Sequence, residues 1–290
     1  MNSVRDPQSG PQADEAEAAD APIGKSRWSA IWEQVSTLIV AILIALAIRA
    51  FLVEPFRIPS GSMFPTLLIG DHLFVNKLTY GPRIPFTEIR LPGFREPERG
   101  DVIVFEVARN NGSEEGLRTD IVPADFYPNL PQDDFVKRLV GLPGDRIYIQ
   151  NGLVSINGIP AEQIATGKVF EDNRGTALAI REEVLVDCVH EVLDDPVLSS
   201  PFGRNREYVV PEGRYFMMGD NRDHSNDSRN WGTIRKEEMK GPAFFLYWSW
   251  DVNGNALQFF NPANWWRADK RWDRVFNRVR CRTIEELGSP

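Results

Sequence analysis

The chain has 290 residues, enough to bury one large core or two smaller ones. Its formal net charge of -8 argues against a nucleic-acid-binding protein, because such proteins present a basic face. Hydrophobic residues make up 42% of the chain, which excludes a chain that is disordered throughout.

The first part of the sequence predicts a disordered tail followed by a membrane anchor. Residues 6–22 are polar, acidic and rich in Ala, Pro and Gln, a composition typical of disorder. From Trp32 to Leu52 the chain is apolar over about 21 residues, or about 31 Å as a helix, which spans the core of a bilayer. Only Glu33 and Arg49 interrupt this run, near its ends, where long charged side chains reach the headgroups.

Two other interpretations of the apolar run remain open. One is a buried core helix, because the strictly uncharged part covers only about 15 residues. The other is a cleaved signal peptide, because Ala45–Ala47 resembles a small-residue cleavage site. The long polar tail and the continuation of the run to Leu52 favour a retained anchor. Lys25 and Arg27 then predict a cytoplasmic N-terminus, with the rest of the chain outside.

Beyond the anchor the sequence predicts a mainly β fold, an antiparallel sheet or barrel-like domain with an inserted subdomain. The expected strands are Asp101–Val107, a hairpin over Arg146–Gly158 that turns at Asn151-Gly152, two strands on either side of Pro211–Gly213, and Gly241–Trp250. Residues 109–134 are polar and contain Pro and Gly, so we expect a long loop there. The more charged stretch from about Pro160 to Asn205 is the expected insertion.

The segment PFRIPSGSMFPTLLIGD, Pro55 to Asp71, follows the anchor almost directly and contains Ser60 and Ser62. A serine in a bend rich in Pro and Gly is either a turn residue or a nucleophile. A nucleophilic serine needs a base from elsewhere in the chain. His224 is one candidate, since aspartates surround it, although a polar loop residue is the interpretation we favour for it.

Lys137 is the other candidate base, because it lies between apolar pairs in DFVKRLVGLPGD. In an alternating strand Lys137 and Arg138 point to opposite faces, so one can be buried while the other is solvated or paired. Burial penalises the ammonium form and lowers the lysine pKa from about 10.4 by several units, which makes the amine a usable base. An edge strand with two ordinary basic residues is the alternative.

Four sequence blocks stand in one order behind the anchor. They are EPFRIPSGSMFPTLLIGD (Glu54–Asp71), RGDVIVF (Arg99–Phe105), KRLVGLPGD (Lys137–Asp145) and GDNRDHSNDSRNWG (Gly219–Gly232). With these blocks the chain resembles the bacterial type I signal peptidases, also called leader peptidases, which are membrane-bound serine proteases with a Ser/Lys dyad. A single S-G-S-M would be weak, but four blocks in order are specific.

The resemblance implies a role for each matching residue. Ser62 corresponds to the nucleophile and Lys137 to the general base, while the Ser60 hydroxyl and the Ser62 N–H form the oxyanion hole and Ser225 orients the lysine amine. Asp220, Asp227 and Arg229 correspond to supporting residues, which we expect in ion pairs that involve Arg138 and Arg222. The apolar residues expected to line shallow pockets for small substrate side chains are Ile58, Met63, Leu67, Phe135 and Val136.

The resemblance also implies the reaction and its place. We expect a single-pass enzyme of the bacterial cytoplasmic (inner) membrane that removes signal peptides from exported preproteins after Ala-x-Ala, with its catalytic domain on the periplasmic side. Its expected partners are preproteins and the lipid bilayer, with no nucleic acid, cofactor or metal. The expected divisions are a cytoplasmic tail (1–28), a transmembrane anchor (29–53), a catalytic β domain (54–262) with the insertion near 160–205, and a basic, aromatic C-terminal segment (263–290).

Some features leave alternatives open. Cys188 and Cys281 are either bonded or free, and no Cys/His spacing suggests a metal site. In residues 263–280, Trp265, Trp272, Phe276 and Val279 share a face at helical spacing, so this segment is a helix on lipid or a helix on the β core. Two other functions compete: a Ser/Lys protease such as a self-cleaving repressor, which needs no anchor, and a membrane-bound β scaffold without chemistry, which leaves the sequence blocks unexplained.

Overall fold

The computed structural model describes residues 27–85, 87, 89–110, 120–127, 129–150, 152–195, 205–251 and 269–287. The chain divides into two compact units, Met1–Ala45 and Leu46–Pro290. The expected tail therefore lies almost wholly outside the described residues, and so do Trp265 and Trp266 of the C-terminal segment.

Helix α1 (Arg27–Phe51) is the predicted apolar helix. Its stretch Ile31–Phe51 has 21 residues and a mean hydropathy of 2.1, and none of it is buried against protein. A core helix of a soluble domain would hide its apolar side chains. Length, composition and exposure are therefore those of a membrane anchor.

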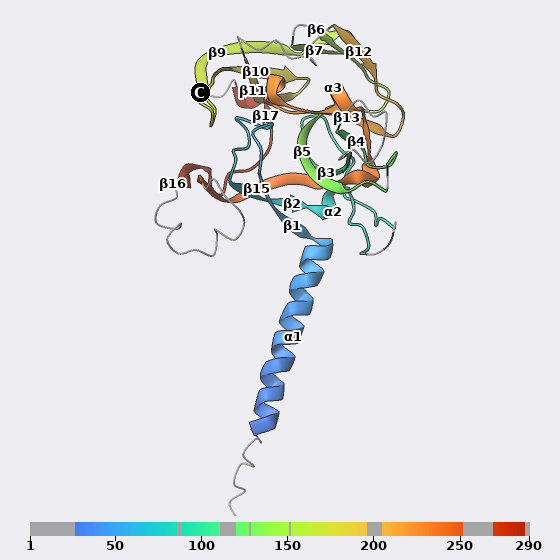
Figure 1. The fold of residues 1–290 in the computed structure, drawn as a ribbon, viewed down its shortest axis with the longest axis vertical. Helices are drawn as coiled ribbons and strands as arrows, with labels where there is room; N and C mark the ends of the chain where they lie inside the picture. The colour runs from blue at the N-terminus through green and yellow to red at the C-terminus, as the bar shows by residue number, and fades with distance from the viewer. Residues whose placement is uncertain are drawn as a thin grey trace, which may run out of the picture. The chain divides into compact units, whose positions relative to one another are not determined.

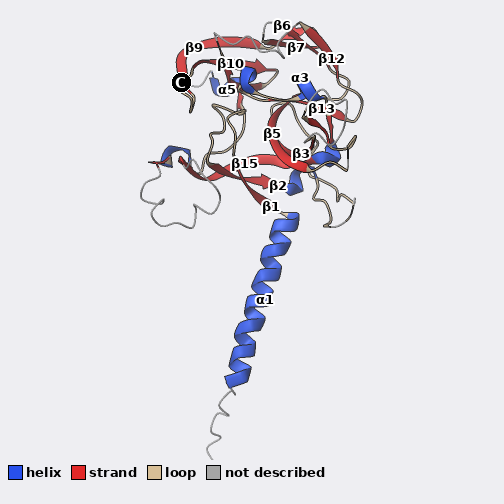
Figure 2. Ribbon diagram, viewed as in Figure 1, coloured by secondary structure: helices blue, strands red, loops and turns tan. Residues whose placement is uncertain are grey.

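Strands predominate in the second unit (Figure 2). They are β1 (Val53–Arg57), β2 (Asp71–Asn76), β3 (Val102–Arg109), β4 (Ile121–Pro123), β5 (Gln132–Gly141), β6 (Arg146–Gln150), β7 (Leu153–Ile156), β8 (Ile159–Pro160), β9 (Glu162–Glu171), β10 (Ala177–Leu185), β11 (Cys188–Asp194), β12 (Arg206–Val209), β13 (Arg214–Met218), β14 (Ile234–Arg235), β15 (Met239–Asp251), β16 (Asp269–Lys270) and β17 (Arg282–Thr283). The short helices are α2 (Lys77–Tyr80), η1 (Arg222–His224), α3 (Ser228–Trp231), η2 (Lys236–Glu238), η4 (Trp272–Arg274) and α5 (Ile284–Leu287).

Within the described residues, the main sheet has the strand order β1-β2-β15-β3-β5-β13-β14, with β16 and β4 paired at its side. Every pairing in it is antiparallel. Strand β5 lies between β3 and β13, so the edge-strand alternative for Lys137 is wrong (Figure 1). The predicted mainly β fold is confirmed.

Two smaller antiparallel sheets complete the unit, β12-β6-β7-β8 and β17-β11-β10-β9. The expected hairpin is present, with Gln150 opposite Leu153 and Gly152 at a φ of +81°. The two strands around Pro211–Gly213 are also present, but they do not pair with each other. Strand β12 pairs with β6 and β13 with β5, because the turn between them carries the chain from one sheet to another.

Two other expectations differ from the structure. The loop expected over residues 109–134 contains strand β4, and β5 begins at Gln132. Only residues 269–280 of the expected C-terminal helix are described. They contain strand β16 and the short helical turn η4, and no helix longer than η4. Helical spacing was misleading here because Leu246 takes backbone hydrogen bonds with Phe276 and Asn277, which hold this segment extended against β15.

Gly70, between the serine bend and β2, tests how the backbone positions that bend. Its φ is +87°, and an added Cβ would overlap the carbonyl oxygen of Trp250. We expect Gly70→Ala to destabilise the protein by about 3 kcal/mol or more, since both the left-handed backbone and the overlap oppose a side chain. Thermal unfolding of the detergent-solubilised protein measures the loss.

Gly152→Ala is the matched control. Gly152 has a similar φ of +81°, but an added Cβ would meet nothing within 4 Å. Its expected cost is about 1 kcal/mol, from the backbone alone. Equal losses for the two variants would show that the close approach at Gly70 is unimportant.

Candidate active site

The bend that carries Ser60 and Ser62 connects β1 to β2. Its ends are joined by two backbone hydrogen bonds, from Ile58 N to Asp71 O (2.8 Å) and from Gly70 N to Ile58 O (3.0 Å). Ser60 is exposed and Ser62 is half-buried, whereas the next residue, Met63, is fully buried in the core. The buried side chain fixes the bend, and the serine beside it is left at the surface of the fold.

Asp71, at the start of β2, braces the bend from behind. Its carboxylate accepts hydrogen bonds from Leu68 N (2.8 Å), Ser249 Oγ (2.6 Å) and Arg274 Nη2 (2.6 Å). The same guanidinium group also donates to Thr66 O (2.9 Å). A buried charge with this many partners holds one geometry, so these contacts hold the bend in position.

Lys137 reaches the bend from β5, where it lies opposite Ile103 of β3. Its side chain is buried, with 2% of its surface exposed, and its Nζ lies 2.5 Å from Ser62 Oγ. An ammonium group donates to the hydroxyl across this contact, and a neutral amine accepts from it. The structure thus brings together the serine and the lysine that the sequence singled out.

Burial lowers the pKa of Lys137 to about 8. The charges of Asp227 and Asp220 oppose this effect, and the nearby Arg229 guanidinium adds to it. A substantial fraction of the amine is therefore neutral in mildly alkaline solution, and only the neutral amine can take a proton.

Three buried ion pairs involve residues of the GDNRDHSNDSRNWG block. Arg138 binds Asp220 through Nε (2.8 Å) and Nη2 (2.6 Å), and Arg229 Nε lies 2.8 Å from Asp227 Oδ1. The third pair joins Arg222 to Glu183 on β10, at 2.6 and 2.7 Å. Arg222 was expected to pair with one of the two aspartates. That expectation is wrong, because its guanidinium group binds the Glu183 carboxylate of β10 instead.

Asp227 also holds the local backbone. Its carboxylate accepts from Gly219 N (3.0 Å) and from Arg229 N (3.2 Å) at the start of α3. Burial disfavours its charge, but the Arg229 guanidinium and the Gly219 N–H outweigh burial and hold the pKa of Asp227 below its ordinary value. Asp227 is therefore ionised throughout the pH range in which Lys137 titrates.

Ser225 lies near the serine bend, with 2% of its surface exposed. A Cβ on Gly219 would overlap Ser225 Oγ and would lie 2.5 Å from Ser62 O, so Gly219 leaves no space between them. Ser225 also lies beside the Asp227 carboxylate, whose pKa its hydroxyl helps to lower. Its lysine-orienting role stays a prediction.

Asn221 is a site residue that the sequence analysis missed. Its N–H donates to Ser62 O (3.1 Å), and its Nδ2 donates to Gly61 O (3.0 Å). Asn221 also forms a bridge with Leu193 of β11. It lies inside the GDNRD block, so its place beside the predicted aspartates was the only available signal.

A cavity of about 320 Å³ opens beside Ser62. Ser60, Asn221 and His224 line it, together with Asp172–Arg174 from the turn between β9 and β10. The residues predicted to form substrate pockets do not line this cavity. Ile58, Met63 and Leu67 are buried in one core cluster, and Val136 packs against that cluster. Phe135 packs against a neighbouring core cluster. Their pocket role stays a prediction.

His224, the alternative base, faces the same cavity, but its Nε2 lies 3.0 Å from Asp195 Oδ2. The hydrogen bond with Ser62 Oγ comes from Lys137 instead. The geometry therefore favours the lysine over the histidine as the base.

One cluster in the described part of the chain has the spacing of metal ligands. The side-chain ligand atoms of Cys188, His190 and Cys281 lie within 4.8 Å of one another. The two cysteines form a disulfide with a Cα–Cα distance of 5.1 Å. While this bond is intact, neither sulfur is a thiolate, so the cluster does not offer a metal its usual ligands.

Comparison with known proteins assigns the family. The model of the family described as signal peptidase, peptidase S26, matches residues 31–248. The signal peptidase I of Pseudomonas aeruginosa is 35% identical over 222 residues, which cover 72% of this chain and 69% of that protein. That of Pseudomonas fluorescens is 37% identical with the same coverage, and that of Haemophilus influenzae is 32% identical over 86% of this chain and 76% of its own.

The four sequence blocks and the family match agree. The blocks between Glu54 and Gly232 all lie within the matched residues, as does most of the apolar helix. The chain therefore belongs to the signal peptidase family, peptidase S26, and is a hydrolase of that family.

Proposed function

We propose that this enzyme removes signal peptides from exported preproteins after Ala-x-Ala, with Ser62 as the nucleophile and Lys137 as the general base. The observation that carries the proposal is the 2.5 Å contact between Lys137 Nζ and Ser62 Oγ, made by an amine that is 2% exposed. A nucleophile and a base within hydrogen-bond reach are the minimum for covalent catalysis of acyl transfer.

The reaction begins when the neutral Lys137 amine takes the Ser62 proton and Oγ attacks the carbonyl carbon of the scissile bond. The Ser62 N–H and the Ser60 hydroxyl stabilise the negative charge on the carbonyl oxygen; one such donor contributes about 3 kcal/mol in comparable enzymes. The lysine ammonium then protonates the departing amine, which is the N-terminus of the mature protein. Water, activated by the same amine, hydrolyses the ester on Ser62.

Specificity for small side chains is assigned to apolar surface near the serine. The residues proposed to form it are Ile58, Met63, Leu67, Phe135 and Val136. Because the first three are packed in the core, we expect only shallow depressions over them, which would fit Ala better than a larger side chain. An extended substrate would add alongside a strand edge.

The membrane placement follows from α1. An apolar helix of this length anchors the enzyme where a preprotein is still held in the bilayer by its own apolar segment. Lys25 and Arg27 favour a cytoplasmic N-terminus, and the proposed catalytic unit then lies on the periplasmic side of the inner membrane. The negative net charge argues against a nucleic-acid partner.

The division of the chain follows from these roles. Residues 1–28 are the proposed cytoplasmic tail, 29–53 the anchor, and 54–262 the catalytic domain, with the insertion near 160–205. Residues 263–290 form the remaining C-terminal segment. The contacts of Arg274 with Asp71 indicate that this last segment supports the serine bend.

Replacing either member of the dyad tests the proposal. We expect Ser62→Ala and Lys137→Met each to lower kcat/KM by at least about 1,000-fold, because a nucleophile and its base act as one unit. The measurement is cleavage of a purified preprotein whose signal ends in Ala-x-Ala, by detergent-solubilised enzyme. Sequencing the product N-terminus checks that the cut follows the alanine.

Lys236→Met is the matched control, because Lys236 pairs with the exposed Glu96 and takes no part in the site. We expect its activity to equal that of the unmodified enzyme. If Lys137→Met retains activity, Lys137 is not the base, and His224 is the next residue to test. Cleavage at bulky residues as fast as after alanine would remove the specificity part of the proposal.

The pH dependence gives a second test. Since the neutral form of Lys137 is the active one and its pKa is about 8, kcat/KM rises with pH and reaches a plateau above that value. Below the midpoint, each unit of pH lowers the rate by about tenfold. A profile with no midpoint near 8 would count against Lys137 as the base.

A further inference from the structure

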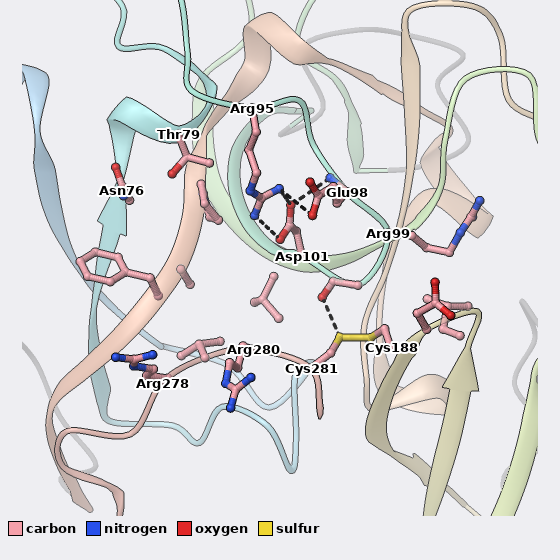
Figure 3. A pocket seen from close by; sticks show the side chains of 18 of the residues that line it. Asn76, Thr79, Arg95, Glu98, Arg99, Asp101, Cys188, Arg278, Arg280 and Cys281 are labelled. Carbon is pink, nitrogen blue, oxygen red and sulfur yellow. Dashed lines mark hydrogen bonds and ion pairs between the residues drawn. A yellow bond between two sulfur atoms is a disulfide. The ribbon is translucent and has the colours of Figure 1, made fainter. Parts of the chain in front are cut away.

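A second cavity, of about 970 Å³, lies apart from the serine, and neither Ser62 nor Lys137 lines it. Cys188 and Cys281 line it with their disulfide, as Figure 3 shows. Arg278 and Arg280 lie on the wall that carries Cys281 (Figure 3). A cavity of this volume admits a molecule of the size of a small peptide.

The disulfide is accessible from this cavity through Cys281. Cys188 is buried, with 6% of its surface exposed, whereas Cys281 is partly exposed. Thiol–disulfide exchange requires that a thiolate reach one of the two sulfurs. Because Cys281 is the more exposed of the two, we expect a small thiol in the cavity to attack Cys281 Sγ.

The other side of the disulfide contacts the charges beneath the active site. Arg138 Nη1 donates to Cys281 Sγ (3.4 Å) and to Gly100 O (2.8 Å). The rest of the same guanidinium group binds Asp220, at 2.6 and 2.8 Å. One buried cation is therefore shared between the disulfide and this aspartate.

The Arg138–Asp220 pair in turn contacts the segments of both reacting residues. Arg138 follows Lys137 directly on β5. Thr66, four positions after Ser62 in the same bend, donates its hydroxyl to Asp220 Oδ2 (2.6 Å). If Arg138 shifts from Asp220 towards the disulfide, two things change together: the electrostatic field on the Lys137 amine, and the contacts of Asp220 that hold the bend through Thr66.

We propose that the Cys188–Cys281 disulfide is an exchange site for a low-molecular-weight thiol, and that its reduction slows peptide cleavage by drawing Arg138 away from Asp220. The exchange itself requires only that a thiol reach the disulfide through the cavity, whereas its effect on cleavage rests on the proposed function.

The exchange takes two steps. The thiolate of the small molecule attacks Cys281 Sγ, the S–S bond breaks, and Cys188 leaves as a thiolate beside His190 Nδ1, which lies 3.7 Å away. A second small thiol attacks the outer sulfur of the mixed disulfide and releases Cys281 as a thiolate. The protein sulfurs gain two electrons, and two small thiols are oxidised to their disulfide. Of the two protons that the small thiols release, one goes to Cys188 and the other to solvent, so Cys281 stays a thiolate beside Arg138.

Reduction changes the charge that Arg138 meets. A Cys281 thiolate accepts from the guanidinium more strongly than a disulfide sulfur does, so it competes with Asp220. Asp220 is then less neutralised, and its charge holds the Lys137 amine protonated to higher pH. The charged and titratable groups involved are Asp227 and Arg229 around Lys137, and His190, Glu183 and Arg222 around Asp220.

The exchange is tested with reduced glutathione and the full-length, detergent-solubilised protein. Mass spectrometry after alkylation counts the free cysteines. We expect the count to rise from none to two while the circular dichroism spectrum of the folded protein persists. The Ser62→Ala variant behaves in the same way, since exchange needs no peptidase activity. Cysteines that react only after unfolding would overturn the exchange site.

The coupling is tested by the pH midpoint of Lys137, before and after reduction. We expect a rise of about half a unit, which lowers cleavage below the midpoint about threefold, and recovery on reoxidation. A variant with Cys188→Ser and Cys281→Ser does not respond to glutathione. Complete reduction with an unchanged midpoint would overturn the coupling.

Competitive labelling of Lys137 by a small amine-reactive reagent gives the same midpoint without any cleavage. If the oxidised enzyme fails to cut the preprotein, the proposed function fails, and the labelling midpoint still decides the coupling. A midpoint that rises on reduction supports it, and one that stays constant rejects it.

Discussion

The burial of the Lys137 amine against the Ser62 hydroxyl is the constraint on which the rest of this site depends. Water would keep the amine protonated, so the fold has to exclude water from it. Strand β5 achieves this because it lies inside the main sheet, between β3 and β13. The bend between β1 and β2 then covers the amine from the other side.

Buried charges near the amine have to be neutralised for this arrangement to work. Asp220 and Asp227 both favour the protonated lysine, and either one without a partner would raise its pKa. Arg138 and Arg229 bind these two carboxylates in the protein interior. The ion pairs thus limit the electrostatic field on Lys137. This role does not require that they stabilise the fold.

Strands β10 and β11 are part of the site's support. Glu183 of β10 binds Arg222, and the backbone of Leu193 on β11 donates to Asp220 O (2.9 Å). The turn at residues 172–174 lines the cavity beside Ser62. These contacts connect β10, β11 and the turn between β9 and β10, whose sequence gives no sign of a role in the site, to the segment around Asp220 and Asn221 that contacts the Ser62 backbone.

The sequence by itself determined the apolar helix, the β class of the fold, and the residue types able to do the chemistry. These signals are local: a run of apolar residues, an alternating pattern, a Pro/Gly bend with serine, and a lysine between apolar pairs. Long-range pairing was decided by the tertiary structure alone. Spacing along the chain does not reveal that Arg222 binds Glu183, or that Cys188 bonds Cys281 across 93 residues. Such partners are chosen by sheet order and packing, and those depend on the whole chain.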